Sequence, residues 1–164
     1  MIEEERTLYA RMKLVDSIFI NRPAGTVWAF LEDPANMPLW NPKVKRVSPS
    51  SFAAIRQGYR YAITYQMHER AKASEFLAEF VHFAPPTKLV IRHTGGPDSQ
   101  NRVIEEMYEL SERDGGTFLI QTIHIDNAGI NIFLRFLVWL IQRWGRPTGK
   151  RYLETLRDII EGNK

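Results

Sequence analysis

A chain of 164 residues, of which 44% are hydrophobic, is long enough to form one domain with a sizeable core. It has no cysteine, which excludes disulfides, thiolate metal sites and a cysteine nucleophile and fits a reducing, cytoplasmic setting. The net charge of +3 is modest, and basic and acidic residues are interspersed, which argues against a nucleic-acid partner. The acidic start Met-Ile-Glu-Glu-Glu-Arg is unlike a signal peptide, so we expect no secretion.

The first predicted elements are a strand near residues 12–21 and a helix near 23–32, with residues 1–10 as a candidate flexible lead-in. Pro23 stands where proline favours the start of a helix. Asp33 and Pro34 end this helix and predict a second, short one near 34–39. The residues expected to share the apolar face of the first helix are Ala24, Val27, Trp28 and Leu31.

The rest of the chain predicts a run of strands closed by a helical region. The strands are expected near 43–49, 57–68, 71–84, 87–95, 101–112 and 116–127, and the helical region near 130–161. Turn signals include Pro85-Pro86 and Asp114-Gly115-Gly116, which indicate short hairpins. An antiparallel sheet of this kind must cover one face, and the C-terminal helix can do so.

Strand alternation predicts which side chains point toward the covered face of the sheet. Most of them are apolar, but a row of polar groups lies among them, which is the composition of a small-molecule site. The candidate ligand-binding residues are Tyr59, Tyr61, Tyr65, Phe80, His82, His93, Glu106, Tyr108 and Gln121.

A tight turn at Asp114-Gly115 places Glu106 opposite Gln121, whose amide could donate to the buried carboxylate. Other interpretations stay open. The two histidines and the tyrosines could be ordinary core residues, and a one-residue shift of the strand would turn Glu106 toward solvent.

Known catalytic and cofactor motifs do not occur in the sequence. It has no phosphate-binding loop, dinucleotide fingerprint or nucleophile elbow. Its four histidines show no metal-ligand spacing, so we expect neither a metal nor a cofactor. Acid/base chemistry by His82, His93, Glu106 or a tyrosine remains possible.

Residues 130–141 are apolar almost all round a predicted helix, but the segment is too short to span a membrane. Leu134, Val138 and Trp139 are expected on its outer side. They could form a ligand portal, a homodimer surface or a weak membrane contact, or they could be covered as plain core.

Several short segments match one family pattern in the same order along nearly the whole chain. They are Pro23-Ala24-Gly25-Thr26-Val27-Trp28, Trp40-Asn41-Pro42, Gln57-Gly58-Tyr59, Pro85-Pro86, Asp114-Gly115-Gly116-Thr117 and Tyr152-Leu153-x-x-Leu156. The pattern resembles the START and birch-pollen-allergen-like superfamily, and within it the polyketide cyclase/dehydrase and lipid-transport (SRPBCC) group. The resemblance implies an α+β helix-grip fold: a seven-stranded curved antiparallel sheet wrapped around a long C-terminal helix, with two short helices after the first strand. Residues 1–164 are then a single ligand-binding domain.

The resemblance also implies a function. We expect a carrier, sensor or sequestering protein that binds a hydrophobic or aromatic small molecule, such as a lipid, a polyketide-like compound or an isoprenoid, in a central cavity. Two alternatives stay open: a cyclase- or dehydratase-type enzyme, and an interaction module of the ribosome-associated or coenzyme-Q-chaperone kind. The family has no universal catalytic motif, so the resemblance leaves open whether the chain is an enzyme.

Overall fold

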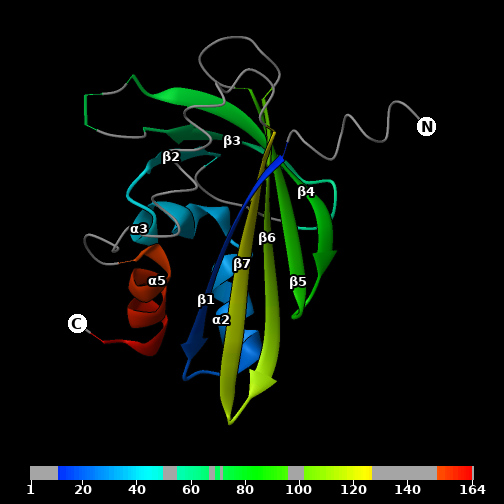
Figure 1. Ribbon diagram of the computed structural model, residues 1–164, viewed down its shortest axis with the longest axis vertical. Helices are drawn as coiled ribbons and strands as arrows, with labels where there is room; N and C mark the ends of the chain where they lie inside the picture. The colour runs from blue at the N-terminus through cyan, green and yellow to red at the C-terminus, as the bar shows by residue number, and fades with distance from the viewer. Residues whose placement is uncertain are drawn as a thin grey trace.

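The computed structural model describes residues 11–49, 55–66, 69–70, 72–95, 102–126 and 151–163. These residues form a seven-stranded antiparallel sheet in the order β1-β7-β6-β5-β4-β3-β2 (Figure 1). The strands are β1 (Arg11–Ile20), β2 (Val44–Ser48), β3 (Arg60–Tyr65), β4 (Ser74–Ala84), β5 (Lys88–Gly95), β6 (Arg102–Arg113) and β7 (Gly116–Asp126). The predicted fold class is confirmed.

The described helices lie on the concave side of this sheet. They are α2 (Ala24–Leu31), the 3₁₀ helix η1 (Pro34–Asn36), α3 (Met37–Trp40) and α5 (Tyr152–Glu161). In Figure 1 the sheet bends around them, with β1, β7 and β6 running along the helical layer and β2 and β3 turned across one end. The curvature therefore creates an enclosed inner face.

The segment that joins β1 to β2 folds as its sequence predicts. Pro23 precedes the first turn of α2, and the four apolar residues expected on one helical face are all buried. The Asp33 carboxylate accepts a hydrogen bond from the Ala35 N–H at 2.9 Å, which caps η1. Trp40 is buried against the Tyr108 ring, 6.5 Å between centroids, so α3 contacts the inner face of the sheet.

Helix α5 is fastened to the edge strand β1 at both ends. Arg151, which precedes the helix, forms an ion pair with Asp16 and donates to the Ser17 carbonyl. At the other end, the Glu161 carboxylate accepts from the Asn21 N–H at 2.6 Å. The helix therefore lies along the β1 side of the sheet and contacts α3 as well.

The buried face of α5 is narrower than the apolar stripe in its sequence. Leu153 and Leu156 are fully buried, and Ile160 packs against the core. Tyr152 and Ile159 belong to the same apolar stripe of the helix but are exposed, because they lie at its margins. Lys43 lies over the Tyr152 ring, 5.6 Å from Nζ to the centroid, and covers part of it.

The convex face of the sheet carries charge pairs across neighbouring strands. They are Arg46–Glu75, Arg60–Glu79, Arg92–Glu105 and Lys88–Glu109. Such exposed pairs contribute little stability each, but they keep this side of the strands polar. Two residues depart from the pattern: Phe118 and Ile120 are half-buried on this side, and the Arg113 guanidinium lies over the Phe118 ring at 5.4 Å.

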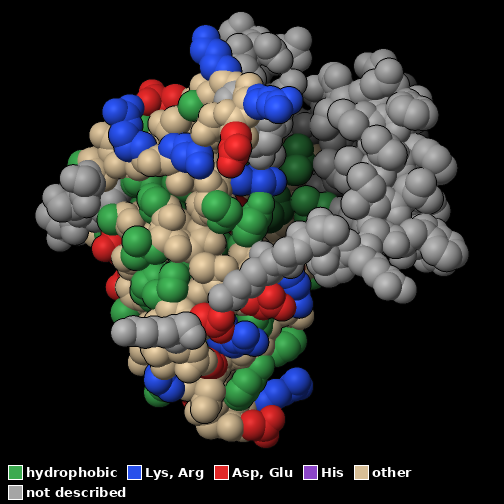
Figure 2. Space-filling model, turned by 90° about the vertical axis from the view of Figure 1, so that its left-hand side faces the viewer, with side chains coloured by type: hydrophobic (Ala, Val, Ile, Leu, Met, Phe, Trp, Pro, Cys, Tyr) green, Lys and Arg blue, Asp and Glu red, His purple; other side chains and the backbone are tan. Residues whose placement is uncertain are grey.

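Figure 2 views the molecule from the side on which α3 and α5 lie. Hydrophobic side chains form separate groups there, with charged side chains between and around them. In the described ranges, no helix is both long and apolar enough to cross a membrane.

Candidate functional site

Four side chains from three adjacent strands form a buried polar row on the concave face: His93 of β5, Glu106 and Tyr108 of β6, and Gln121 of β7. His93 is 1% exposed and Glu106 5% exposed, and the other two are buried as well. Strand alternation brings them to one face, because each is separated from its inward neighbours by an even number of positions. We call this set the polar row.

Glu106 is the centre of the polar row. One oxygen of its carboxylate, Oε1, accepts a hydrogen bond from the Tyr108 hydroxyl at 2.5 Å and another from the Gln121 amide at 2.5 Å. The other oxygen, Oε2, lies 3.4 Å from His93 Nε2. Gln121 also donates to the Tyr108 hydroxyl at 3.2 Å, so the four groups form one network.

These contacts decide the charge of Glu106. Burial by itself raises the pKa of a carboxyl group, because the charged form loses its hydration. At Glu106 the nearby His93 imidazole, together with hydrogen bonds from Tyr108 and Gln121, outweighs burial and lowers the pKa from its ordinary value of 4.5. Glu106 is therefore a carboxylate inside the protein at neutral pH.

The tyrosines near Glu106 keep their protons. Burial, reinforced by the negative charge of Glu106, raises the pKa of Tyr61, Tyr65 and Tyr108 well above 10.0. Each hydroxyl is thus neutral and able to donate a hydrogen bond throughout the physiological range.

His93 differs from the other members of the row because its polar atoms are incompletely satisfied. Nε2 faces Glu106 at a distance longer than a good hydrogen bond, and Nδ1 has no hydrogen-bond partner in the described structure. Both nitrogens are inaccessible to solvent. A buried imidazole with an unpartnered nitrogen is unusual in a folded protein and calls for an explanation.

Aromatic rings border the polar row. The edge of Tyr65 meets His93, with 5.8 Å between ring centroids, and Tyr65 also contacts Phe76. Tyr61 and Phe80 are in edge contact at 5.7 Å, and Phe83 stacks on Phe80 at 5.9 Å. A few polar groups are thus set in a wall of apolar and aromatic surface.

Most of the sequence-predicted residues lie where they were expected. Tyr61, Phe80, His93, Glu106, Tyr108 and Gln121 are buried on the concave face, and Tyr59 and Tyr65 are half-buried against the core. Their orientation is confirmed, while their role in binding a ligand stays a prediction.

The predicted pairing of Glu106 with Gln121 is displaced by two residues. Tyr108 is the direct partner of Gln121, and Glu106 faces Ile123. Asp114 and Gly115 both have positive φ, 51° and 79°, so the hairpin loop has only two residues and sets this register. A shift of two keeps every side chain on its face, so the Gln121 amide still reaches Glu106 diagonally.

The predicted inward orientation of His82 is wrong. The pairing of β4 with β5 shifts between Phe80 and His82, where one extra residue forms a bulge. Beyond a bulge the alternation is reversed, so His82 is exposed and Phe83 points inward in its place. Sequence reasoning missed two residues near the site, Phe83 and Ile91. Ile91 is the direct strand partner of Glu106. The apolar character of Phe83, next to a polar His82, was the available signal.

Other sequence predictions fall outside the site or outside the described residues. Leu134, Val138 and Trp139, with the whole segment 130–141, lie beyond the described ranges. His124 is on the convex side of β7 and half-buried. Among the described residues, no group of three or more His, Asp or Glu side chains could hold a metal ion.

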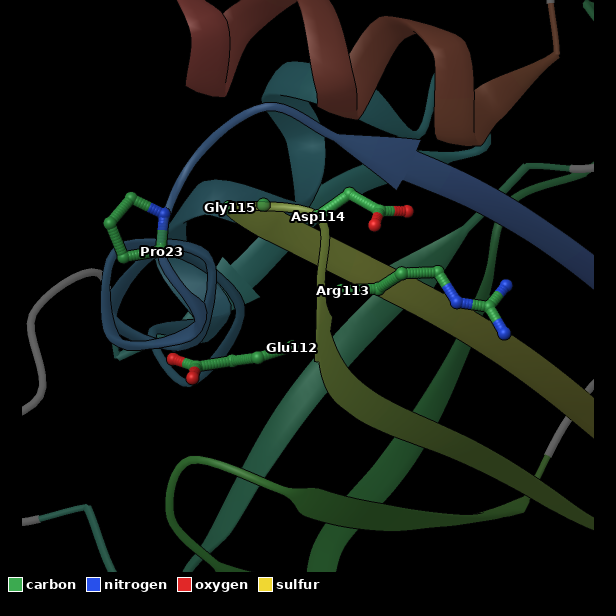
Figure 3. Close-up of a pocket in the computed structure, with 6 residues that line it drawn as sticks. Pro23, Glu112, Arg113, Asp114 and Gly115 are labelled. Atoms are coloured by element: carbon green, nitrogen blue, oxygen red, sulfur yellow. The ribbon is translucent and has the colours of Figure 1, made fainter.

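A separate open hollow lies at the tip of the β6–β7 hairpin (Figure 3). It has a volume of about 270 Å³ and is lined by Pro23, Glu112, Arg113, Asp114, Gly115 and Gly116. Figure 3 shows Glu112 pointing toward the start of α2, while Arg113 points away from it. The hollow includes no member of the polar row.

A curved antiparallel sheet around helices, with a buried and partly polar inner face, defines the class of helix-grip proteins. The family model for polyketide cyclase / dehydrase and lipid transport matches residues 11–161, and the chain belongs to this family. No match was found among proteins with curated descriptions.

Solved structures with the same fold are distant in sequence. Ara h 8.0201 superimposes with a TM-score of 0.62 at 13% identity, covering 93% of this chain and 99% of that one. Protein CV1439 from Chromobacterium violaceum gives 0.63 at 15% identity, with 91% and 96% covered. Protein TTHA0849 from Thermus thermophilus gives 0.62 at 17% identity, with 93% and 96% covered. These similarities show the fold. The family match over residues 11–161 identifies the chain as a member of the START and birch-pollen-allergen-like superfamily.

Proposed function

We propose that this protein binds a hydrophobic or aromatic small molecule against the concave face of its sheet, as a carrier, sensor or sequestering protein. The family, described as polyketide cyclase / dehydrase and lipid transport, has a fold suited to such ligands. The proposed ligand is a lipid, a polyketide-like compound or an isoprenoid.

The observation that carries the proposal is the polar row itself. A structural core gains little from a buried carboxylate, because an apolar replacement of similar volume is often as stable. Here Glu106 is surrounded by donors, and those donors are set among tyrosine and phenylalanine rings. Such an arrangement suits recognition of one polar group on an otherwise apolar molecule.

Acid/base catalysis on a polyketide-like compound is a second candidate function. The contact between His93 and Glu106 favours it, because a carboxylate can orient an imidazole and stabilise its protonated form. Catalysis would change the bound compound, whereas a carrier would release it unchanged.

Native mass spectrometry after gentle purification tests the proposal. We expect the folded protein to retain a small apolar molecule at a stoichiometry of about one, as a single site requires. Phe80→Trp should reduce the retained fraction by filling the inner face, at a cost of about 1–3 kcal/mol in stability. A protein that carries no ligand, and that binds apolar fluorescent probes only as it unfolds, would refute the proposal.

The same experiment separates the two candidate functions. Incubation of the purified protein with the recovered compound, followed by mass analysis, should return the compound unchanged if the protein is a carrier. Conversion to a product, at a rate reduced in His93→Gln, would instead identify an enzyme.

A further inference from the structure

Exposed apolar side chains lie on the two helices α3 and α5, which contact each other. Leu39 of α3 is 61% exposed, and Tyr152 and Ile159 of α5 are 37% and 38% exposed. Met37 and Trp40, on either side of Leu39 in the same helix, are buried, so Leu39 points away from the core. Half of the exposed large hydrophobic side chains in the described ranges therefore belong to these two short helices.

The contacts of α5 show which way its exposed apolar flank faces. Glu161 accepts a hydrogen bond from the Asn21 N–H and so lies on the flank that faces β1. At about 3.6 residues per turn, Tyr152 and Ile159 lie on the opposite flank of the helix. Lys43, which precedes β2, agrees with this orientation, because its Nζ lies 5.6 Å from the centroid of the Tyr152 ring. The exposed flank of α5 therefore faces α3 and the start of β2.

Basic side chains border this apolar group. Lys43 and Lys45 lie at the start of β2, and Lys45 is exposed where the pairing of β2 with β3 shifts. Within the described ranges neither lysine forms an ion pair. In Figure 2, Lys and Arg side chains gather at the upper end of this side of the molecule, next to the hydrophobic groups. Residues 34–68 contain no Asp or Glu, and their Lys and Arg residues are Lys43, Lys45, Arg46, Arg56 and Arg60.

The acidic side chains of α5 leave this positive charge in place. Glu161 lies on the flank that faces β1, and Glu154 lies near it, two turns earlier in the helix. Asp158 forms an ion pair with Arg157 of the same helix. The surface around Leu39 is therefore apolar and positively charged.

We propose that the surface formed by Leu39, Lys43, Lys45, Tyr152 and Ile159, the α3–α5 surface, docks on a membrane that contains anionic lipids. The apolar side chains enter the boundary between headgroups and acyl chains, the tyrosine ring lies at headgroup level, and the lysines contact the negative headgroups. The contact is peripheral, because no helix in the described ranges is long and apolar enough to cross a membrane. The inference goes beyond the proposed function and does not depend on it, since docking requires no bound ligand.

A second copy of the chain fits this surface less well than a membrane does. A two-fold dimer brings the same patch of both copies together, so the unpaired lysines of one copy would face those of the other. Like charges at an interface are unfavourable. Anionic headgroups instead supply the opposite charge that Lys43 and Lys45 lack.

Co-sedimentation with vesicles tests whether the protein binds such a membrane. Vesicles of phosphatidylcholine alone are compared with vesicles in which about one-third of the lipid is phosphatidylserine. We expect the wild-type protein to partition onto the anionic vesicles at least about tenfold more strongly, as two lysines near a charged surface require. High salt should remove this difference, because it screens exposed charges.

Two double variants separate the charged from the apolar part of the contact. Lys43→Gln combined with Lys45→Gln should lower partitioning onto the anionic vesicles about tenfold, because the electrostatic attraction is lost. Leu39→Gln combined with Ile159→Gln should lower it by a similar factor, about tenfold, because less apolar area enters the membrane. Circular dichroism confirms that each variant is folded.

Matched controls lie on the convex face of the sheet. Lys13→Gln combined with Lys88→Gln removes the same charge as the lysine variant of the α3–α5 surface. Val15→Gln replaces an apolar side chain that is 59% exposed, close to the value for Leu39. Both controls should change partitioning by less than about twofold, because the convex face is turned away from the docked membrane.

A fluorescent label shows which face meets the membrane. Since the chain has no cysteine, a single introduced cysteine can carry an environment-sensitive dye. Dye on Leu39→Cys or Ile159→Cys should shift its emission to shorter wavelength when anionic vesicles are added. Dye on Val15→Cys or Leu77→Cys, two exposed positions of the convex face, should not respond.

Several results would overturn the inference. They are no binding to anionic vesicles, equal effects of the α3–α5 variants and the convex controls, and equal dye responses on the two faces. A dimer in sedimentation equilibrium that Leu39→Gln dissociates, without vesicle binding, would assign the surface to a second copy and overturn it as well. None of these results bears on the proposed function, because ligand retention is measured without vesicles.

Discussion

Burial alone would favour the protonated form of the Glu106 carboxyl group, and its contacts with His93, Tyr108 and Gln121 reverse that preference. The folded-state pKa is below the ordinary value of 4.5, so ionised Glu106 stabilises the folded protein at pH values above the ordinary pKa. That contribution is lost as the pH falls through the lowered pKa.

The first prediction follows from the lowered pKa of Glu106. The difference in free energy of unfolding between the wild-type protein and Glu106→Gln should be largest at about pH 6 and should shrink by about pH 3. Urea denaturation at a series of pH values measures it. Glu105→Gln, on the convex face of the same strand, is the control and should change stability by at most about 1 kcal/mol. A difference that stays constant, or grows toward low pH, would contradict the assigned charge of Glu106.

The two histidines of β4 and β5 provide a second prediction. His93→Ala should destabilise the protein by about 3–5 kcal/mol, because it removes the partner of a buried carboxylate and leaves a cavity. His82→Ala should change stability by no more than about 0.5 kcal/mol, because His82 is exposed. Denaturation midpoints in urea distinguish these outcomes. Equal effects at the two positions would show that the bulge in β4 is misplaced.

At the scale of elements, helix α5 depends on two buried leucines and on polar contacts at its ends. We predict that Leu156→Ala costs about 2–5 kcal/mol, because Leu156 is fully buried. Ile159→Ala, one turn further along and 38% exposed, should cost clearly less, about 1 kcal/mol or below. Thermal or urea unfolding of the pair provides the measurement. A reversed order would mean that α5 is rotated about its axis.

The β6–β7 hairpin packs closely against the end of β1 at Gly116. A Cβ atom there would lie 2.6 Å from the Ile20 carbonyl oxygen and 2.6 Å from Cζ of Phe19. Gly116→Ala should therefore destabilise the protein by more than about 1 kcal/mol, because backbone must move. Gly25→Ala within α2 meets no atom within 4 Å and should stabilise the protein by about 0.5–1 kcal/mol. Calorimetric melting temperatures should thus move in opposite directions.

At the scale of the whole molecule, local chemistry was enough to predict the order of elements. The proline before α2 and the aspartate cap of η1 act within a few residues and have the expected effect, and Asp114-Gly115 forms the expected turn, although with a different register. Period-two alternation then indicated the inner face of β3, β5, β6 and β7. The order of strands and helices could therefore be predicted before any contact was known, and the family resemblance implied the helix-grip architecture.

The parts that could not be predicted depend on long-range pairing. The bulge after Phe80 depends on how β4 pairs with β5, and the one local sign of it is the apolar Phe83 beside the polar His82. The register at Gln121 was displaced because the loop length was misjudged. The contact of His93 with Glu106 likewise follows from the diagonal geometry of two paired strands.

A pair of spectra tests whether a ligand binds at the polar row. A long-range ¹H–¹⁵N correlation spectrum of the imidazole rings, recorded with and without a saturating concentration of the uncharged naphthalene ketone propionyl-dimethylaminonaphthalene, compares His93 and His82 in one sample. We predict that the nitrogen and ring-proton signals of His93 shift on binding while those of His82 stay in place. Unchanged His93 signals at saturation, or shifts at His82 of the same size, would contradict binding at the polar row.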